Sequence, residues 1–129
     1  MRDHRQLRAF QLADELVLVV YKVTRSFPSD ELYGLRSQIR RSAVSVPSNI
    51  VEGCTRDGEK EFVRFLDIAF GSLRELSYQL DLSRRLRFIV DEDWKACESI
   101  LIEADKVLVA LIRSKRKALS AETPESLNP

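Results

Sequence analysis

The amino-acid sequence predicts an all-α protein, an antiparallel up-and-down four-helix bundle. Four segments of the 129-residue chain repeat apolar side chains every three or four residues, which is the spacing of one helix face. The chain has only 4 glycines and 4 prolines, too few turn residues for a β-sandwich or barrel. Because the connections between the four segments are short, consecutive helices should run antiparallel. We expect one domain over residues 1–118 and a disordered tail over residues 119–129.

The first helix is expected from about residue 6 to residue 25. Pro28 lacks an N–H and restricts the residue before it, so the segment Ser26-Phe27-Pro28 should end this helix. The apolar side chains that should face the core are Phe10, Ala13, Val17, Val20 and Val23.

The second helix is expected to begin at residues 29–31. Ser29 can act as its N-cap, and two acidic residues follow in the first turn. Helical spacing of apolar residues then continues as far as Gly53. Pro47 falls inside this pattern, where it should kink the helix or remove one backbone hydrogen bond. The apolar positions are Leu32, Leu35, Ile39, Val46 and Ile50.

Two longer helices are expected after a short connection. The third should span residues 59–86, and its Gly71-Ser72 pair offers a thin spot where another helix can approach closely. The fourth should span residues 91–117, beginning with three acidic residues and ending in a basic cluster, as the helix dipole favours.

The charge balance restricts the class of function. The chain holds 21 basic and 20 acidic residues, and this net charge of +1 argues against a strongly basic nucleic-acid-binding domain. No apolar run approaches the roughly 20 residues that a membrane span requires, and the charged N-terminus does not resemble a signal peptide. We therefore expect a cytoplasmic protein with no membrane partner and with reduced cysteines.

The side chains offer little for catalysis. His4 is the only histidine and lies in a charged N-terminus that we expect to be mobile, which leaves no histidine-based triad and no di-iron motif. No glycine-rich phosphate loop is present. Cys54, beside Arg56, could be a reactive thiol, although a small residue near a turn is the simpler interpretation, and Cys97 falls on the core face of the fourth helix. We predict no enzymatic activity, no cofactor, no metal and no small-molecule substrate.

A polar stripe on the second helix is the least ordinary feature. Its side chains are uncharged and short except at one end, whereas an exposed face in this highly charged chain should carry lysine and glutamate. Such a stripe can face solvent, or it can form a semi-buried seam within the bundle or between subunits, where hydrogen bonds determine the register. The predicted seam comprises Gln38, Ser42, Ser45, Asn49 and Glu52, with Ser72 and Glu75 of the third helix as its partners.

The central part of the chain resembles a bacterial protein family. The pattern in the second helix is Phe27-Pro28, Glu31, Gly34-Leu35, Gln38, Arg40-Arg41, Ser45-Val46-Pro47, Asn49-Ile50 and Glu52-Gly53. The pattern in the third helix is Glu61-Phe62, Phe65-Leu66, Ala69, Gly71-Ser72-Leu73 and Glu75-Leu76. In this joint pattern, residues 7–112 are similar to the four-helix-bundle or S23 proteins, first noted as products of intervening sequences in 23S ribosomal RNA genes.

The resemblance implies a homopentameric ring of four-helix bundles with no enzymatic activity. The family includes the accessory variability protein of diversity-generating retroelements. The retroelement members are strongly basic and are thought to bind nucleic acid and a reverse transcriptase. The present chain is not strongly basic. The motif residues Gln38, Asn49, Glu52, Gly71, Ser72 and Glu75 are, by this resemblance, architectural.

Opposite charges are concentrated in different segments of the chain. Residues 91–112 hold six acidic and two basic residues, a local charge of −4, whereas residues 1–28 hold five basic and three acidic ones. This asymmetry favours a homo-oligomer in which the acidic fourth helix of one subunit meets a basic face of the next.

The alternative function is a nucleic-acid-binding or ribonucleoprotein accessory protein, associated with ribosomal RNA or a reverse transcriptase, that binds RNA or DNA weakly. For any single arginine, ordinary solvated charge is the simpler interpretation. The candidate phosphate contacts are Arg36, Arg40, Arg41, Arg84, Arg85, Arg87, Arg113, Lys115, Arg116 and Lys117.

Overall fold

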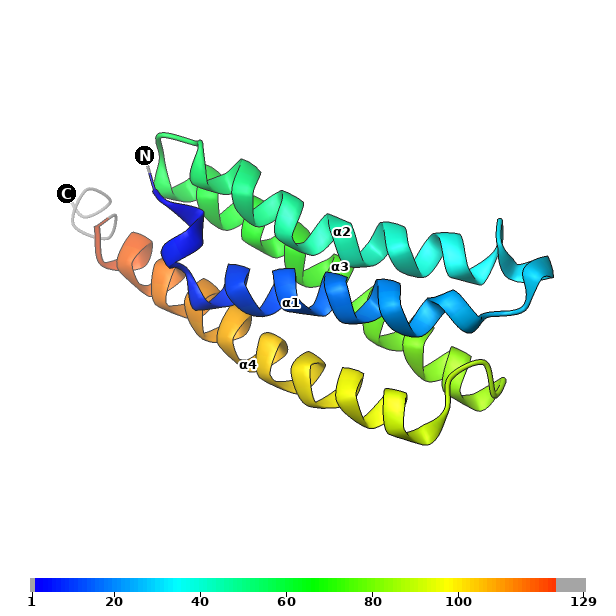
Figure 1. Cartoon of the computed structure of the whole chain (residues 1–129). Coiled ribbons are helices and arrows are strands. Elements are labelled where there is room, and N and C mark those ends of the chain that lie inside the picture. The colour runs from blue at the N-terminus through cyan, green and yellow to red at the C-terminus, as the bar shows by residue number, and fades with distance from the viewer. Residues whose placement is uncertain (1, 123–129) are drawn as a thin grey trace.

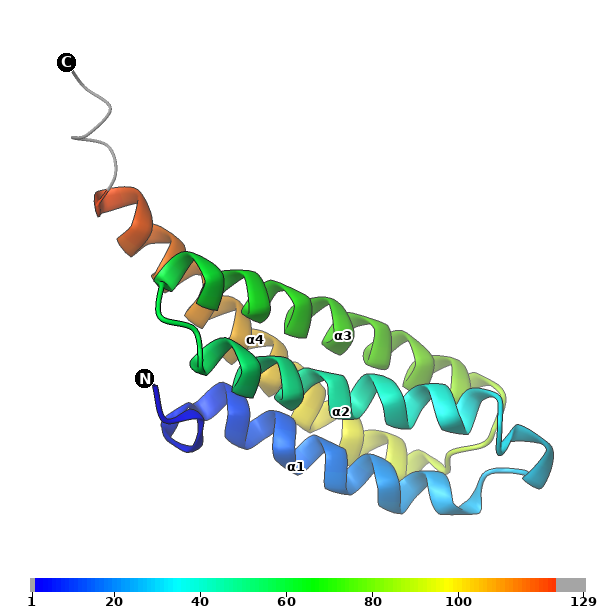
Figure 2. The same ribbon diagram turned by 90° about the horizontal axis from the view of Figure 1, so that it is seen from above.

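The computed structural model describes residues 2–122, which form one four-helix bundle (Figure 1 and Figure 2). The helices are α1 (Arg8–Val23), α2 (Leu35–Cys54), α3 (Glu59–Arg85) and α4 (Asp91–Glu122). Three short 3-10 segments, η1 (His4–Gln6), η2 (Thr24–Ser26) and η3 (Ser29–Glu31), lie beside α1 or precede α2. Consecutive helices run antiparallel and α1 packs against α4, so the predicted fold class is confirmed.

The arrangement of the helices places two of them on opposite sides of the bundle. Helices α1 and α3 each pack against both α2 and α4, so α2 and α4 lie diagonally across from each other. Because α1 and α3 run in the opposite direction, α2 and α4 point the same way. Figure 1 shows that α2 and α4 begin at the same end of the bundle.

A single hydrophobic core runs between the four helices. The side chains of Leu16, Ile39, Phe62 and Leu66 are essentially fully buried. On α1, Leu12 and Leu16 are buried together with the predicted Ala13, Val20 and Val23. Phe10 and Val17 lie at the margin of this face and are only partly buried. On α3 the apolar side chains at helical spacing are all buried: Phe62, Phe65, Leu66, Ala69, Leu73, Leu76 and Leu80.

The start of α2 differs from the expectation. Residues 29–31 form a separate 3-10 segment, and α2 begins at Leu35. The backbone at Gly34 has φ −107° and ψ −118°, which is outside the helical region and separates the two elements. The Glu31 carboxylate accepts a hydrogen bond of 2.9 Å from the Leu35 N–H and so satisfies a donor of the first turn. The predicted N-cap at Ser29 is wrong, and Leu32 is 42% exposed instead of buried.

Helix α2 continues through Pro47 to Cys54. Because proline has no N–H, the carbonyl of Ala43 loses the donor that it would otherwise have inside the helix. The expected loss of one backbone hydrogen bond therefore falls within a helix that continues beyond the proline.

Gly53 of α2 lies in close contact with α3. A Cβ atom at Gly53 would lie 2.9 Å from the Cβ of Phe65 and 3.2 Å from Cδ1 of Phe62. At Gly71, a Cβ atom would meet nothing within 4 Å, and the residue is exposed. The predicted thin spot at Gly71 is therefore wrong, although Ser72 beside it does contact α2.

The N-terminal segment is anchored to the bundle, in contrast to the mobile N-terminus that we expected. The Arg2 guanidinium lies 4.1 Å from the centre of the Phe62 ring, donates a hydrogen bond of 2.9 Å to the Arg56 carbonyl and forms an ion pair with Glu59. The hydrogen bond from Arg2 holds the pKa of Glu59 below its usual value, and Lys115 acts in the same direction against the effect of burial. His4 packs edge-on against the ring of Phe10.

Helix α4 is longer than expected and continues to Glu122 instead of ending near Lys117. No glycine or proline follows the basic cluster until Pro124, so the sequence has no stop signal at the expected position. The predicted tail therefore starts with four helical residues, and its remainder, residues 123–129, lies outside the described residues. None of the helices within residues 2–122 has the length and apolar character needed to cross a membrane.

Candidate functional site

Four members of the predicted polar seam meet where α2 packs against α3. The Ser42 hydroxyl donates a hydrogen bond of 3.2 Å to the Glu75 carboxylate, and the hydroxyls of Ser45 and Ser72 lie 2.8 Å apart. The Asn49 side-chain amide turns back along its own helix and donates to the Ser45 carbonyl at 2.8 Å. The seam thus links two helices of the same bundle at a partly buried position.

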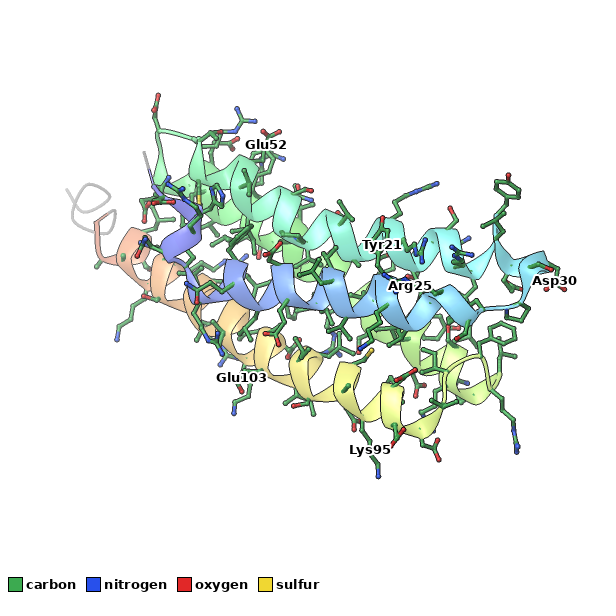
Figure 3. All side chains as sticks on the ribbon, viewed as in Figure 1. Tyr21, Arg25, Asp30, Glu52, Lys95 and Glu103 are labelled. Atoms are coloured by element: carbon green, nitrogen blue, oxygen red, sulfur yellow. The ribbon has the colours of Figure 1, made fainter. Side chains whose placement is uncertain are left out.

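The two ends of the predicted seam are not part of this network. Glu52 is exposed and lies 3.6 Å from Arg56, one turn later on the same helix. Figure 3 shows Glu52 on the α2 side of the bundle, pointing away from the core. Gln38 is also exposed and lines a hollow beside the seam. A functional role for the seam stays a prediction.

Gln79 was not predicted, yet it lies in the same place. It follows Glu75 by one helical turn, is 6% exposed and lines the hollow beside the seam. The spacing of four residues from Glu75 was the signal available in the sequence, because such pairs share one helix face.

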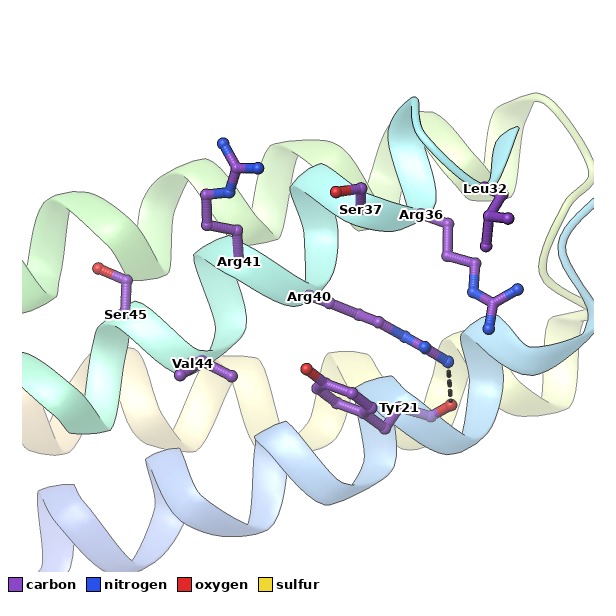
Figure 4. A pocket seen from close by; sticks show the side chains of 8 residues that line it. All are labelled: Tyr21, Leu32, Arg36, Ser37, Arg40, Arg41, Val44 and Ser45. Atoms are coloured by element: carbon purple, nitrogen blue, oxygen red, sulfur yellow. Dashed lines mark hydrogen bonds between the residues drawn. The ribbon is translucent and has the colours of Figure 1, made fainter. Parts of the chain in front are cut away.

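Three of the predicted basic residues gather in a groove between α1 and α2, which we call the basic groove (Figure 4). It has a volume of about 540 Å³. In Figure 4, Arg36 and Arg40 point towards α1, whereas Arg41 points away from it. The residues that line the groove are Tyr21, Leu32, Arg36, Ser37, Arg40, Arg41, Val44 and Ser45.

Arg40 is held in the groove by neutral partners. Its Nε donates a hydrogen bond of 2.9 Å to the buried Thr24 hydroxyl, and Nη2 donates one of 3.1 Å to the Tyr21 carbonyl. The guanidinium also lies 4.4 Å from the centre of the Tyr21 ring. Burial lowers the pKa of Arg40, and the positive charge of Arg36 lowers it further. None of the described residues that line the groove carries a carboxylate, so they leave its positive charge without a local counter-charge.

The remaining predicted basic residues lie elsewhere and are largely paired. Arg84 and Arg85 both contact Asp81, at 2.7 and 3.0 Å, and Arg84 also lies over the Trp94 ring. At the end of α4, Lys115 lies 3.3 Å from Glu59, and Arg116 pairs with Asp67. Within residues 2–122, no ion pair involves Arg87, Arg113 or Lys117. The ten predicted residues therefore form three separate groups and not one continuous surface.

The first half of α4 carries carboxylates without cationic partners, which we call the acidic surface: Asp91, Glu92, Asp93, Glu98 and Glu103. No ion pair to any of these five occurs within residues 2–122, whereas Asp105 lies 3.4 Å from Arg74. Figure 3 shows Glu103 pointing outward on the side of the bundle opposite α2.

Neither thiol has the environment of a nucleophile. Cys54 and Cys97 are free and buried. Burial raises the pKa of the Cys97 thiol to about 11, with Asp93 adding to the effect, and burial also raises the pKa of Cys54. Burial therefore disfavours the thiolate form of both side chains, and with Cys54 only 1% exposed, the simpler interpretation of Cys54 as a small residue near a turn is favoured. Between residues 2 and 122, the structure brings no three His, Cys, Asp or Glu side chains together as a metal site requires.

The fold is thus an all-α four-helix bundle with a basic groove, an acidic surface and a polar seam between α2 and α3. The chain belongs to the family of 23S rRNA-intervening sequence proteins, which it matches over residues 5–110. The resemblance noted in the α2 and α3 motifs is thereby confirmed. No catalytic role is known for this family.

A solved structure shows the same fold. It is a protein of unknown function from the S23 ribosomal protein family of Bacteroides thetaiotaomicron. The two proteins share 23% sequence identity with a TM-score of 0.74, over 81% of this chain and 95% of the other. A comparison with curated proteins found no match.

Proposed function

We propose that this protein is a non-enzymatic homo-oligomer that acts through protein–protein assembly. The observation that carries the proposal is the position of two surfaces of opposite net charge, the basic groove and the acidic surface. The basic groove involves the first turns of α2, and the acidic surface lies on the first turns of α4. Because α2 and α4 are diagonal and point the same way, these surfaces lie on opposite sides of the same end.

This placement suits a ring of subunits. A second copy set beside the first, with its helices parallel, brings its acidic surface level with the basic groove of the first. Each pair then still presents one free acidic surface and one free basic groove. Such a head-to-tail contact repeats until the ring closes.

A two-fold symmetric dimer does not use the same contact. In a two-fold interface, both complementary patches of a subunit must lie on one face, so that each patch meets its counterpart. The opposite faces observed here favour the cyclic arrangement, and five is the subunit number that the family resemblance implies. The proposal places the protein in the cytoplasm, where Cys54 and Cys97 stay as thiols.

Reversing the charge of the acidic surface tests the proposal. In the Glu98→Lys/Glu103→Lys variant, lysines would face the arginines of the neighbouring groove, so we expect light scattering to report a mass close to the 14.9 kDa monomer. The wild-type chain should give a multiple of this mass. Asp14→Lys/Glu15→Lys makes the same change in net charge on exposed positions of α1 and should leave assembly intact.

A compensating variant makes this test specific. Adding Arg36→Glu/Arg41→Glu to the chain that carries both lysines restores opposite charges at every contact, so the oligomer should re-form. A wild-type chain that is monomeric, or a reversed chain that keeps the wild-type mass, would contradict the proposed contact.

Nucleic-acid binding is the second candidate, and the absence of any carboxylate lining the basic groove supports it. Arginines without local carboxylates can contact phosphates, and the affinity should fall steeply as salt concentration rises. A gel shift with single-stranded RNA and with duplex DNA at low salt should show weak binding that Arg36→Gln/Arg41→Gln reduces and Arg113→Gln/Lys117→Gln does not. No shift at low salt would exclude this function.

A further inference from the structure

The basic groove also presents apolar surface. Tyr21, Leu32 and Val44 all line it, and each of these side chains is about two-fifths exposed, at 39%, 42% and 40%. Single exposed apolar side chains are ordinary, whereas several around one hollow are typical of a contact surface. A partner that fills the groove should therefore bring an apolar side chain as well as acidic ones.

Helix α4 carries such a combination in the acidic surface. Ile102 is 55% exposed, although it lies in a helix of a folded bundle. Glu98 precedes it by four residues, so the two side chains share one face of α4, and both line the same hollow on the α3 side of that helix. Along α4, an acidic residue is thus followed one turn later by an exposed apolar residue.

The basic groove has the same order with the opposite charge. Arg40 precedes Val44 by four residues on α2, and the exposed Arg41, which forms no ion pair within residues 2–122, precedes it by three. Because α2 and α4 point the same way, two parallel copies can match the charged pair and the apolar pair at the same time. With the second copy reversed, only one of the two pairs can match.

The lysines of α4 select the register of this contact. Lys95 lies three residues before Glu98, and Lys106 lies four residues after the isoleucine. With Glu98 level with Arg40, these lysines fall opposite Ser37 and Ser48, which are uncharged. A shift by one turn in one direction sets Lys95 against an arginine, and a shift in the other direction sets the isoleucine against an arginine. Both alternatives are less favourable.

We propose that the first half of α4 from a second copy occupies the basic groove, parallel to α2, with Ile102 against Val44 and Glu98 beside Arg40 and Arg41. This contact rests on the assembly proposed above and assigns its residues and register. The apolar pair supplies affinity by leaving water, and the charges select the orientation.

Disulfide cross-linking of the full chain tests the register. Positions 44 and 102 lie on diagonal helices and are exposed, so Val44→Cys/Ile102→Cys cannot form this disulfide within one chain. Between neighbours, a disulfide requires Cα atoms about 4.4–6.8 Å apart. We expect mild oxidation to give a ladder of multiples of 14.9 kDa on a non-reducing gel.

The matched controls for cross-linking should give no ladder. Each single variant, Val44→Cys or Ile102→Cys, lacks the second thiol at the head-to-tail contact, and the natural cysteines are buried. Val44→Cys/Tyr78→Cys places the second thiol on α3, at a residue that is 59% exposed but outside the proposed contact.

Dilution of the oligomer tests the apolar contact. Ile102→Ser should raise the concentration at which half of the oligomer dissociates about tenfold or more, because it removes most of the apolar area that Ile102 would bury. Light scattering over a dilution series measures this concentration. Ile68→Ser makes the same change at a residue of α3 that is 40% exposed, and it should leave the concentration unchanged.

The outcomes separate this contact from the assembly on which it rests. A monomeric wild-type chain would overturn both. A wild-type oligomer that Glu98→Lys/Glu103→Lys dissociates, but that gives no ladder and does not respond to Ile102→Ser, would overturn this contact alone. Dimers formed by the single Val44→Cys variant would show a two-fold contact and would also overturn it. An oligomer unaffected by all of these variants would leave the groove open to another occupant, such as a nucleic acid, and would overturn both proposals.

Discussion

Replacing Phe62 by alanine should lower the free energy of unfolding by about 3–5 kcal/mol. Phe62 is 0% exposed and is among the largest fully buried side chains of the core. Its ring also lies under the Arg2 guanidinium, at 4.1 Å, so the substitution removes a contact that anchors the N-terminal segment. Because small domains are stable by about 5–15 kcal/mol in total, this loss would be a large fraction of the stability.

Urea unfolding followed by circular dichroism measures the effect of Phe62→Ala. Tyr78→Ala is the matched control, since it truncates an aromatic residue on the same helix that is 59% exposed. The control should stay within about 0.5 kcal/mol of wild type. Equal effects of the two substitutions would mean that Phe62 is not a core residue.

The second large effect is expected at Gly53. In Gly53→Ala the new methyl group would lie 2.9 Å from the Cβ of Phe65, an atom that cannot move without its backbone. Helices α2 and α3 would have to separate locally, and overpacking of this kind costs about 1–3 kcal/mol.

On α3, Gly71→Ala should change the stability in the opposite direction. Its Cβ would meet nothing within 4 Å, so the higher helix propensity of alanine should stabilise the protein by about 0.5–1 kcal/mol. The two alanine variants should therefore shift the thermal unfolding midpoint in opposite directions. A stabilising Gly53→Ala would show that the close approach is absent.

The sequence predicted the four helices well where local signals agree with packing. Helix α3 starts at Glu59 and α4 at Asp91, as expected, because acidic residues open both helices after a short connection. The start of α2 was missed because the Ser29-Asp30-Glu31 pattern satisfies a capping rule locally, whereas the chain turns at Gly34 before the helix begins. The close contact at Gly53 was not predicted, because it depends on how α2 and α3 are each rotated about their own axes.

The candidate site was predicted in part. The partners of the serines, Ser72 and Glu75, follow from helix periodicity, since both lie on the face of α3 that meets α2. Periodicity does not reveal that the Oε1 atom of Gln79 is buried without a hydrogen-bond donor, because this depends on how the neighbouring side chains fill space. It also does not show which arginines have acidic partners. The ten basic residues were therefore grouped as one set of candidate phosphate contacts from the sequence, whereas they lie in three places in the structure.

The parallel direction of α2 and α4 has a kinetic consequence. In the proposed assembly, the basic groove on one side of the bundle and the acidic surface on the other would make the electric field of each copy uneven across its long axis. Two copies that approach in solution would be rotated by each other's fields before they touch, which would raise the rate at which the proposed contact forms and make that rate sensitive to ionic strength. The same field would disfavour approach with like faces together, so orientation would be selected before any contact forms.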